Sequence, residues 1–464
     1  MPSRQDQLHS YQYSLQRVVA ALVTHDPDPS RSPLRRAGTT ALVSLLIAAI
    51  AVGAAGLYGI FTGQNTVDPD DPTVVFQEKG TGARFVYLQS DGKLHPVLNY
   101  SSGLLLSSGQ TPKLVSVASD KLAKVQLGAP LGIPNAPDSL PATGDLITDR
   151  WSVCTDNNGP GANPESTLLV GDRLTDGTVA AKADKALLVV DPGQNIFLVY
   201  GNRRFQVPEI GFDNTLRALG YGPQTPWKVS AAWINAVPAG PDLRAPVVPR
   251  SGESTRFGHY EAGQLVKNSS EGFGVIMPDG IASVTPLQAR LLQTAAGGAA
   301  LDIGADFVKL PGSRTKLSDA NDPNGLPQNV PALFTDAPTR VCMTLPVDPG
   351  TGDGVRVDPN PPTGVAVAGV PAAAETNRAD LVHVARGRGA VVVASASATA
   401  PPGSGTVGVV TDTGRLYTLA GGDLLTKLGY SGVKPQNVPS QLVSLLPRGP
   451  SLDPAQARRT DPQG

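Results

Sequence analysis

The chain has 464 residues, 38 of them basic and 39 acidic, with a formal net charge of −1 at pH 7. This balance excludes a polycation that binds nucleic acid or anionic lipid through charge alone. Only 17% of the residues are charged, whereas 51 are glycine and 43 are proline, so we expect turns and short elements rather than long helices.

Residues 1–36 are expected to form a leader that contains one amphipathic helix, from about Gln5 to Val23. The proline of Asp26-Pro27 ends it, because a proline moves the preceding residue away from helical backbone angles. A lone helix has no core of its own, so we expect its apolar face to dock against a partner. The alternative is a helix that lies on the membrane, although the modest positive charge of the leader disfavours simple adhesion to lipid. The apolar face recurs at helical spacing and consists of Leu8, Tyr11, Leu15, Val18, Val19 and Leu22.

Residues 37–61 are the next expected element, a transmembrane helix. No residue from Ala37 to Phe61 is charged, and the next charge is Asp68. A helix of this length extends about 37 Å, enough to cross a hydrocarbon core of about 30 Å with some tilt. The apolar core of a cleaved signal peptide is shorter, roughly 7–15 residues, and follows a brief basic leader. We therefore expect a retained anchor rather than a cleaved signal or a buried core helix.

The charges around this helix predict its orientation. Arg31, Arg35 and Arg36 precede it, whereas the first charges after it are acidic. Basic residues stay on the cytoplasmic side of a membrane. We therefore expect a cytoplasmic leader, a cytoplasmic partner for its helix, and an exported C-terminal region.

The exported region contains an internal repeat. Leu219-Gly220-Tyr221 aligns with Leu428-Gly429-Tyr430, and Gly240-Pro241 aligns with Gly449-Pro450 in the same register without a gap. Several specific residues held in one register indicate duplicated units.

Each unit is expected to contain two strands joined by a tight turn, followed by a short helix. Glycine supplies the positive φ that such turns need, and the expected turns are Asp91-Gly92, Pro192-Gly193, Asp279-Gly280 and Thr413-Gly414. Gly220 and Gly429 stand where a left-handed helix C-cap belongs, with a tyrosine placed to fold back on the helix.

The predicted fold class is α+β. A single N-terminal transmembrane helix is followed by an elongated exported region, in which four small α/β repeats surround a central β domain built from discontinuous segments. Strand-like segments such as RWSVC and TRVCMTL belong to that central domain. The expected boundaries are a linker at 62–79, repeats at 80–140, 185–245, 272–335 and 405–455, central segments at 141–184 and 336–404, a connection at 246–271 and a flexible tail at 456–464.

Cys154 and Cys342 are the two cysteines of the chain, and both lie in the expected exported region. An even pair in an oxidising compartment indicates a disulfide. In the chain-entropy model it would contribute up to about 5 kcal/mol by closing a long loop. Two buried free thiols are the alternative.

No catalytic, cofactor-binding or metal-binding residues are predicted. The sequence has no G-x-x-x-x-G-K-[ST] motif. GSGTVG at 403–408 precedes a strand rather than a helix, so we interpret it as a loop. The five histidines are scattered, which is unlike a metal-ligand cluster. Arg386 and Arg388 could bind a carboxylate or a phosphate, but a solvated hairpin turn explains them better.

Long segments of the chain resemble the EccB family of the mycobacterial-type ESX (type VII) secretion systems. They include DQLHSYQYSLQRVVAALVTHDPDPSRSPLRR, DGKLHPVLNYSSGLLL, LGAPLGIPNAPDSLP, NAVPAGPDLRAP and LGYSGVKPQNVPSQLVSLLPRGPSLDP. The resemblance implies one crossing of the cytoplasmic membrane and an oligomeric assembly with EccC, an FtsK/SpoIIIE-like ATPase, and with EccD, EccE and the mycosin protease. EccB proteins are also sometimes described as ATPases.

We therefore expect a structural subunit of a type VII secretion complex, without a nucleic-acid partner. The alternatives are an exported-side ATPase, which would need ATP as a cofactor, or a cell-wall-binding protein. The lack of a phosphate loop and of a catalytic cluster in the sequence favours the structural role.

Overall fold

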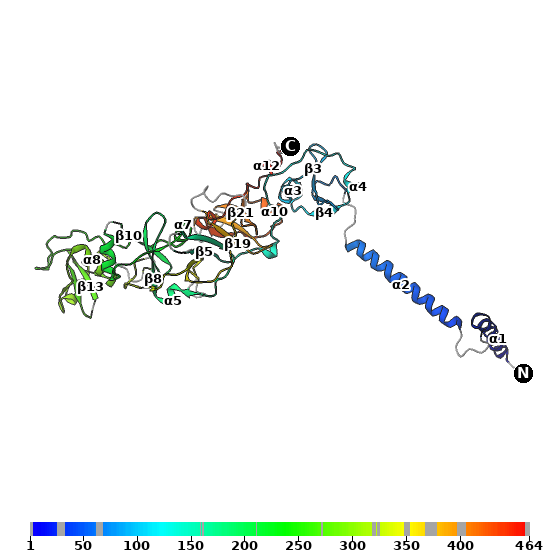
Figure 1. Ribbon diagram of the computed structural model, residues 1–464, viewed down its shortest axis with the longest axis horizontal. Coiled ribbons are helices and arrows are strands. Elements are labelled where there is room, and N and C mark those ends of the chain that lie inside the picture. The colour runs from blue at the N-terminus through cyan, green and yellow to red at the C-terminus, as the bar shows by residue number, and fades with distance from the viewer. Residues whose placement is uncertain are drawn as a thin grey trace.

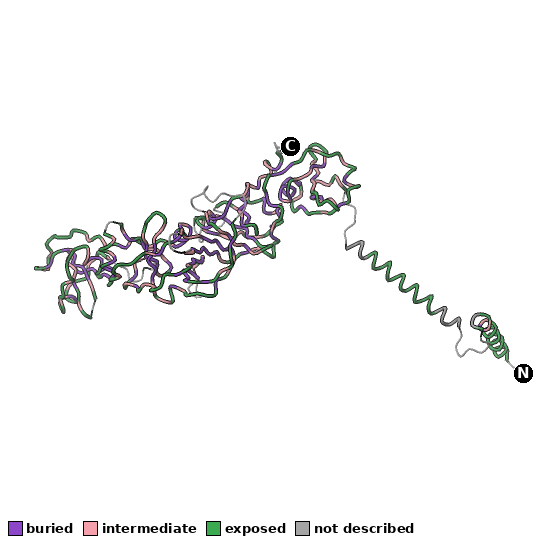
Figure 2. Tube along the Cα trace, viewed as in Figure 1, coloured by how far each residue is buried: buried purple, intermediate pink, exposed green. Residues whose placement is uncertain are grey.

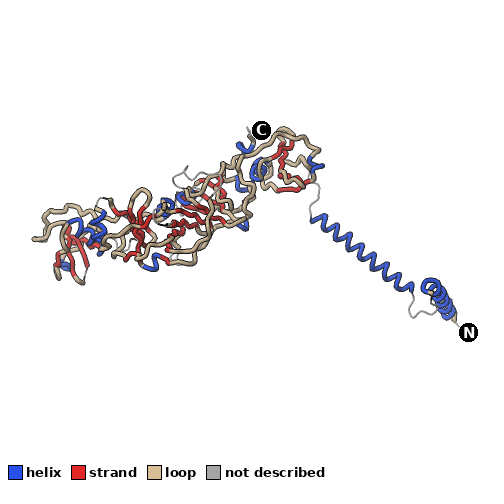
Figure 3. The backbone as a smooth tube through the Cα atoms, in the orientation of Figure 1, coloured by secondary structure: helices blue, strands red, loops and turns tan. Residues whose placement is uncertain are grey.

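The computed structural model describes residues 3–25, 33–61, 68–157, 159, 162–209, 211–270, 272–317, 322, 325–347, 353–366, 378–396 and 405–459. Two N-terminal helices stand apart from an elongated body of strands and short helices (Figures 1 and 3). The expected mixture of helices and sheets behind one long apolar N-terminal helix is confirmed.

Helix α1 (Arg4–Thr24) confirms the leader helix. It begins at a capping box, in which the Ser3 side chain accepts from the Asp6 amide and the Asp6 carboxylate accepts from the Ser3 amide. It ends at His25, which has left-handed backbone angles.

Helix α2 (Pro33–Phe61) contains the expected apolar segment. The window Thr39–Gly56 has a mean hydropathy of 2.0, and none of it is buried within the protein. An apolar helix without protein around it matches a membrane span in length and composition.

Four units follow, and each contributes four strands of the same topology to one sheet. The first three strands form an antiparallel meander, and the fourth lies parallel to the first at the other side of the sheet. A helix connects the third strand to the fourth, because a parallel partner needs a crossover connection. A second helix follows the fourth strand, and it is shorter than the first in units 1, 2 and 3.

The elements of the four units are listed here in chain order. Unit 1 (75–131) contains β1 (Val75–Glu78), β2 (Arg84–Leu88), β3 (Lys93–Pro96), α3 (Tyr100–Leu106), β4 (Leu114–Val117) and α4 (Ser119–Leu122). Unit 2 (185–243) contains β8 (Lys185–Val190), β9 (Ile196–Tyr200), β10 (Arg203–Val207), α6 (Phe212–Leu219), β11 (Trp227–Lys228) and α7 (Ala231–Ala236). Unit 3 (265–313) contains β12 (Leu265–Asn268), β13 (Gly272–Met277), β14 (Gly280–Val284), α8 (Pro286–Ala296), β15 (Leu301–Asp302) and α9 (Asp306–Lys309). Unit 4 (390–452) contains β20 (Ala390–Ser395), β21 (Thr406–Val410), β22 (Leu416–Thr418), α10 (Leu424–Lys427), β23 (Gln436–Pro439) and α11 (Ser440–Val443).

Each unit is closed by a segment that returns to its third strand. One residue of that strand exchanges two backbone hydrogen bonds with the closing segment; these residues are Leu94, Arg204, Ile281 and Leu416. In units 1, 2 and 4 a glycine of the closing segment lies against a ring of the third strand, in the pairs Gly128–His95, Gly240–Phe205 and Gly449–Tyr417. Unit 3 has Ser313 at the glycine position, and the strand residue after Ile281 is the small Ala282. The repeated glycine is therefore explained by the ring that it contacts.

The central sheet has six strands in the order β19-β6-β5-β17-β18-β7. Its strands are β5 (Trp151–Asp156), β6 (Glu165–Val170), β7 (Thr178–Val179), β17 (Arg340–Leu345), β18 (Val355–Val357) and β19 (Leu381–Val384). The first half of the body (68–247) supplies β5, β6 and β7, and the second half (248–459) supplies the others. The halves are interleaved, because β19 pairs with β6 of the first half and β7 pairs with β18 of the second.

Each half also extends a sheet of the other half. β16 (Ala332–Leu333), which follows unit 3, pairs with β8 of unit 2, and Leu146, which follows unit 1, bridges to Gly389 at the start of unit 4. Two tyrosines make matching contacts. The Tyr221 hydroxyl donates to the Pro331 carbonyl at 2.6 Å, and the Tyr430 hydroxyl donates to the Pro141 carbonyl at 2.9 Å. Burial raises the pKa of both tyrosines.

The hydrophobic cores are also shared between the two halves of the chain. One core joins units 1 and 4, another joins units 2 and 3, and the largest joins the central sheet to units 2 and 4. In Figure 1 the body accordingly runs from unit 3 through unit 2, the central sheet and unit 4 to unit 1 beside α2. Three short helices complete the fold: η1 (Thr143–Asp145), α5 (Ala180–Ala183) and α12 (Pro454–Ala457).

Three first strands lie outside the ranges expected for the repeats. β1 falls in the expected linker 62–79, β12 in the expected connection 246–271, and β20 in the expected central segment 336–404. The expected turns lie between strands, but Pro192-Gly193 joins the first and second strands of its sheet, whereas the other three turns join the second and third. Each expected unit contained only one hairpin, whereas each meander has two. The expected hairpin therefore lacks the first strand in units 1, 3 and 4, and in unit 2 it lacks the third strand, β10.

We predict that Gly240→Ala and Gly449→Ala each destabilise the closing segment of their unit. A Cβ at either position would lie under 3.0 Å from a ring, and such overpacking costs about 1–3 kcal/mol. Hydrogen exchange at unit 2 or unit 4 should accelerate accordingly. Gly312→Ala is the matched control in the closing segment of unit 3, because a Cβ there has no neighbour within 4 Å. Equal exchange in all three variants would contradict the ring contact.

Candidate interaction surfaces

The predicted contact face of the leader helix is exposed (Figure 2). Its large side chains expose between 54% and 75% of their surface; they are Leu8, Tyr11, Leu15, Val18 and Leu22. Val19 is half-buried, near the end of α1 that contacts α2. This stripe of apolar side chains is therefore uncovered by the rest of the described chain, and burying it against another molecule would be favourable.

Two of the three predicted membrane-flanking arginines lie on the described backbone. Arg35 and Arg36 belong to the first turns of α2, and Arg31 lies outside the described residues.

The predicted disulfide joins the middle of the central sheet. Cys154 on β5 and Cys342 on β17 are directly opposite each other in the strand register, with a Cα–Cα distance of 3.9 Å, and they form a disulfide. Both residues are fully buried, beside Leu169 and Leu174. The alternative of two buried free thiols is wrong.

Polar pairs flank the disulfide along the same two strands. The Ser152 and Thr344 hydroxyls hydrogen-bond across the pair at 2.8 Å. At the strand end, the Arg340 guanidinium binds the Asp156 carboxylate through two nitrogens. These pairs fix the register in which the halves meet. Each of these four residues lies two residues from a cysteine, but no local pattern in the sequence predicts the pairs.

Within the described ranges, no group of three His, Cys, Asp or Glu side chains is placed to hold a metal ion. His383 pairs with Asp172 at 2.7 Å, on β19 and just after β6. The second part of GSGTVG enters strand β21 rather than a helix, and Gly403 and Ser404 lie outside the described residues.

The arginine-rich turn is not a hairpin. Arg386 and Arg388 are exposed in a turn that connects β19 of the central sheet to β20 of unit 4. The Gly387 amide between them donates to the Asp412 carboxylate at 2.9 Å. Consecutive valine-rich strands suggested a hairpin, but β20 pairs with β21 and β23 instead of β19.

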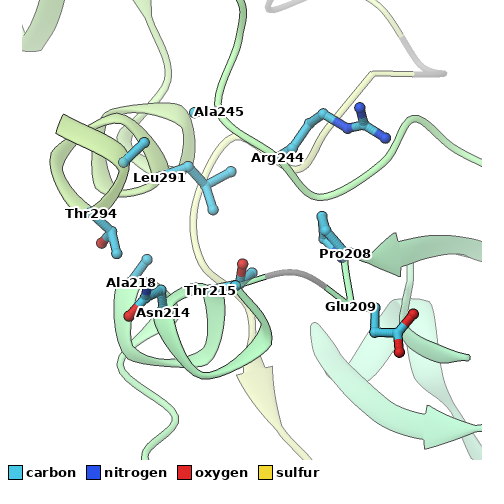
Figure 4. Close-up of a pocket in the computed structure, with 11 residues that line it drawn as sticks. Pro208, Glu209, Asn214, Thr215, Ala218, Arg244, Ala245, Leu291 and Thr294 are labelled. Carbon is cyan, nitrogen blue, oxygen red and sulfur yellow. The ribbon is translucent and has the colours of Figure 1, made fainter. Parts of the chain in front are cut away.

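A hollow of about 650 Å³ lies between helices α6 and α8, where units 2 and 3 meet (Figure 4). Thr215 and Ala218 of α6 face Leu291 and Thr294 of α8 across it. Glu209 and Arg244 lie on its other side. We call this hollow the α6–α8 groove. Its volume is within the range of ligand pockets. No local pattern in the sequence predicts the groove, because its walls come from two units.

One apolar helix followed by interleaved sheets is also the arrangement expected from a known protein family. The family described as "Type VII secretion system ESX-1, transport TM domain B", the EccB family, matches residues 1–462. The chain belongs to this family.

Curated relatives in mycobacteria agree with this assignment. The chain is 29% identical to "ESX-3 secretion system ATPase EccB3" of Mycolicibacterium smegmatis, over 96% of this chain and 88% of the relative. It is 26% identical to the protein of the same name from Mycobacterium tuberculosis, over 97% of this chain and 88% of the relative.

Solved structures share the fold. A chain in the structure of an intact ESX-5 inner membrane complex superposes with a TM-score of 0.67 at 23% identity, over 99% of this chain and 96% of that chain. The EccB3 dimer from the ESX-3 core complex gives a TM-score of 0.64 at 23% identity, over 83% of this chain and 100% of that chain.

We predict that the double variant Cys154→Ala/Cys342→Ala loses up to about 5 kcal/mol of stability, because the disulfide no longer restricts the unfolded chain. The folded native chain should not react with a thiol reagent, since both cysteines are buried in a disulfide. Peptide mapping without reductant should recover Cys154 and Cys342 in one linked peptide. Labelling of either cysteine in the folded, unreduced chain would contradict the assignment.

Proposed function

We propose that this protein is a structural membrane subunit of a type VII secretion complex. The observation that supports this best is the match to the EccB family over residues 1–462 together with an uncovered apolar face on α1. A chain that only anchored a soluble domain would have no need for an apolar stripe on the far side of its membrane helix.

The proposed orientation places α1 in the cytoplasm and the five sheets outside the membrane. Arg35 and Arg36 at the start of α2, and Asp68, Asp70 and Asp71 after it, support this orientation through the positive-inside rule. The buried Cys154–Cys342 disulfide also fits an oxidising compartment.

The proposed partners follow from the family. Solved relatives come from an ESX-5 inner membrane complex and an ESX-3 core complex. We propose that the leader face contacts the cytoplasmic parts of EccC-, EccD- or EccE-like subunits, and that the exported body contacts the mycosin protease or further copies of this chain. The mixed apolar and aromatic character of the leader face suits a protein interface.

We also propose that the four units are copies of one ancestral unit. Their common strand order, their matching closing hydrogen bonds and the glycine-on-ring contact of three of them support a duplication. Repeated units of this kind form extended surfaces for partners.

An exported-side ATPase is the second candidate, and cell-wall binding is the third. The relatives carry the word ATPase in their names, which is the observation in favour of the second. Nucleotide sites of the common kind need a phosphate-cradling loop with its lysine, and the sequence has none. We therefore place the structural role first and propose no catalytic residues or cofactor.

The leader face gives the test of this proposal. In the complex purified from the native membrane, Leu8→Glu/Leu15→Glu should reduce recovery of the FtsK-type ATPase and the other membrane subunits about tenfold or more, because two charges would enter a buried apolar contact.

The matched control is His9→Glu/Gln16→Glu, which adds two carboxylates to other faces of α1. It should leave recovery of the partners unchanged, and both variants should insert into the membrane equally. Full recovery of the partners with Leu8→Glu/Leu15→Glu would contradict docking through this face. Purification of the unaltered chain without any secretion subunit would contradict the structural role itself.

A further inference from the structure

Units 1 and 4 pack together in the same manner as units 2 and 3. In each pair, the helix between the third and fourth strands of one unit contacts the equivalent helix of the other, α3 with α10 and α6 with α8. The chain leaves the sheet of unit 4 and the sheet of unit 2 at matching residues. The Leu452 amide donates to the Thr418 carbonyl at 2.7 Å, and the Leu243 amide donates to the Gln206 carbonyl at 2.8 Å.

After Leu452 the chain forms a short helix that packs against α3, one helix of this pair. Asp453 has extended backbone angles and caps the Ala455 amide, and Pro454 occupies the first helical position, where proline is favoured. This helix, α12, contacts α3 and buries Ala457 completely in the core shared by units 1 and 4.

After Leu243 the sequence cannot form the same helix. Pro246 and Pro249 hold Ala245 and Val248 away from helical angles, because each of these residues precedes a proline. Val247 is left 84% exposed. The helix that covers one pair of units therefore has no counterpart in the other pair.

The α6–α8 groove lies where that counterpart would be. Arg244 and Ala245, the residues that align with Asp453 and Pro454, border the groove. Leu291 and Thr294 of α8, the equivalent of α3, form the facing wall (Figure 4). The groove between units 2 and 3 therefore corresponds in position to the site that α12 occupies between units 1 and 4.

We propose that the α6–α8 groove docks a short helical turn from another polypeptide, of the kind that α12 represents. Such a turn begins with an acidic N-cap and a proline and carries alanine-sized side chains toward the groove. Ala218 of α6 and Ala295 of α8 leave room for a backbone to approach. An acidic N-cap would lie beside Arg244, an exposed arginine that also pairs with Asp242. This inference rests on the proposed function in one respect: the other polypeptide would come from the secretion complex.

A peptide with the sequence of residues 451–459, SLDPAQARR, is the probe. Saturation-transfer NMR with the full chain in detergent should show binding of this peptide. Ala295→Trp, which fills the groove, should weaken binding about tenfold, a loss of about 1.4 kcal/mol. Ala296→Trp, next to it on α8, exposed and outside the groove lining, should change binding by less than about twofold.

A second peptide, with glutamate at the position of Ala457, tests the mode of docking. It should bind about tenfold more weakly, because the residue buried in the α12 seat then carries a charge. No binding of SLDPAQARR, or binding that Ala295→Trp and the glutamate peptide leave unchanged, would overturn the proposal. The peptide could also bind by displacing the chain's own α12. Weaker binding to Ala295→Trp would exclude this, because Ala295 borders the α6–α8 groove and not the site of α12. The assay uses no secretion partner, so its outcome is independent of the recovery of partners through the leader.

Discussion

The antiparallel pairing of β5 with β17 is the contact on which the rest of the elongated body depends. These strands come from different halves of the chain, and the disulfide joins them at Cys154 and Cys342 with the residues directly opposite each other. Once this register is set, β6 and β18 add on either side, and the outermost strands cross to the other half. Each half therefore completes its sheets with residues of the other.

This interleaving explains how small units make one long body. A four-stranded sheet with two short helices buries little surface by itself, and small domains are marginal for that reason. The pairing of unit 1 with unit 4 and of unit 2 with unit 3 enlarges each core, and the central sheet connects the pairs. An elongated body of this kind can hold partners at separate places along its length, which suits a structural subunit more than an enzyme with one cleft.

Local features were predictable from the sequence, and long-range ones were not. The leader helix, the apolar span and the left-handed C-cap at Gly220 follow from short-range rules, and the structure contains them. Of the four expected turn glycines, only Gly92 and Gly414 have a positive φ, and in the Pro192-Gly193 turn the residue with a positive φ is Gln194. Gly429 also has a positive φ, but it follows Leu428, the C-cap of α10. The cysteine pair followed from its compartment. β20 was assigned to the central domain because a valine-rich strand has the same pattern in either sheet. The order of units and the α6–α8 groove depend on contacts between distant segments, which no local pattern contains.

The most direct test of the interleaved architecture is to cut the chain between its halves. A protease site inserted after Val247, which is 84% exposed, would separate units 1 and 2 from units 3 and 4 after cleavage. We expect the cut chain to elute as one particle even with reductant. Its pieces should separate under denaturing conditions only when the Cys154–Cys342 disulfide is reduced. Two halves that separate in native buffer with reductant would show that they fold side by side, and would contradict the exchange of strands.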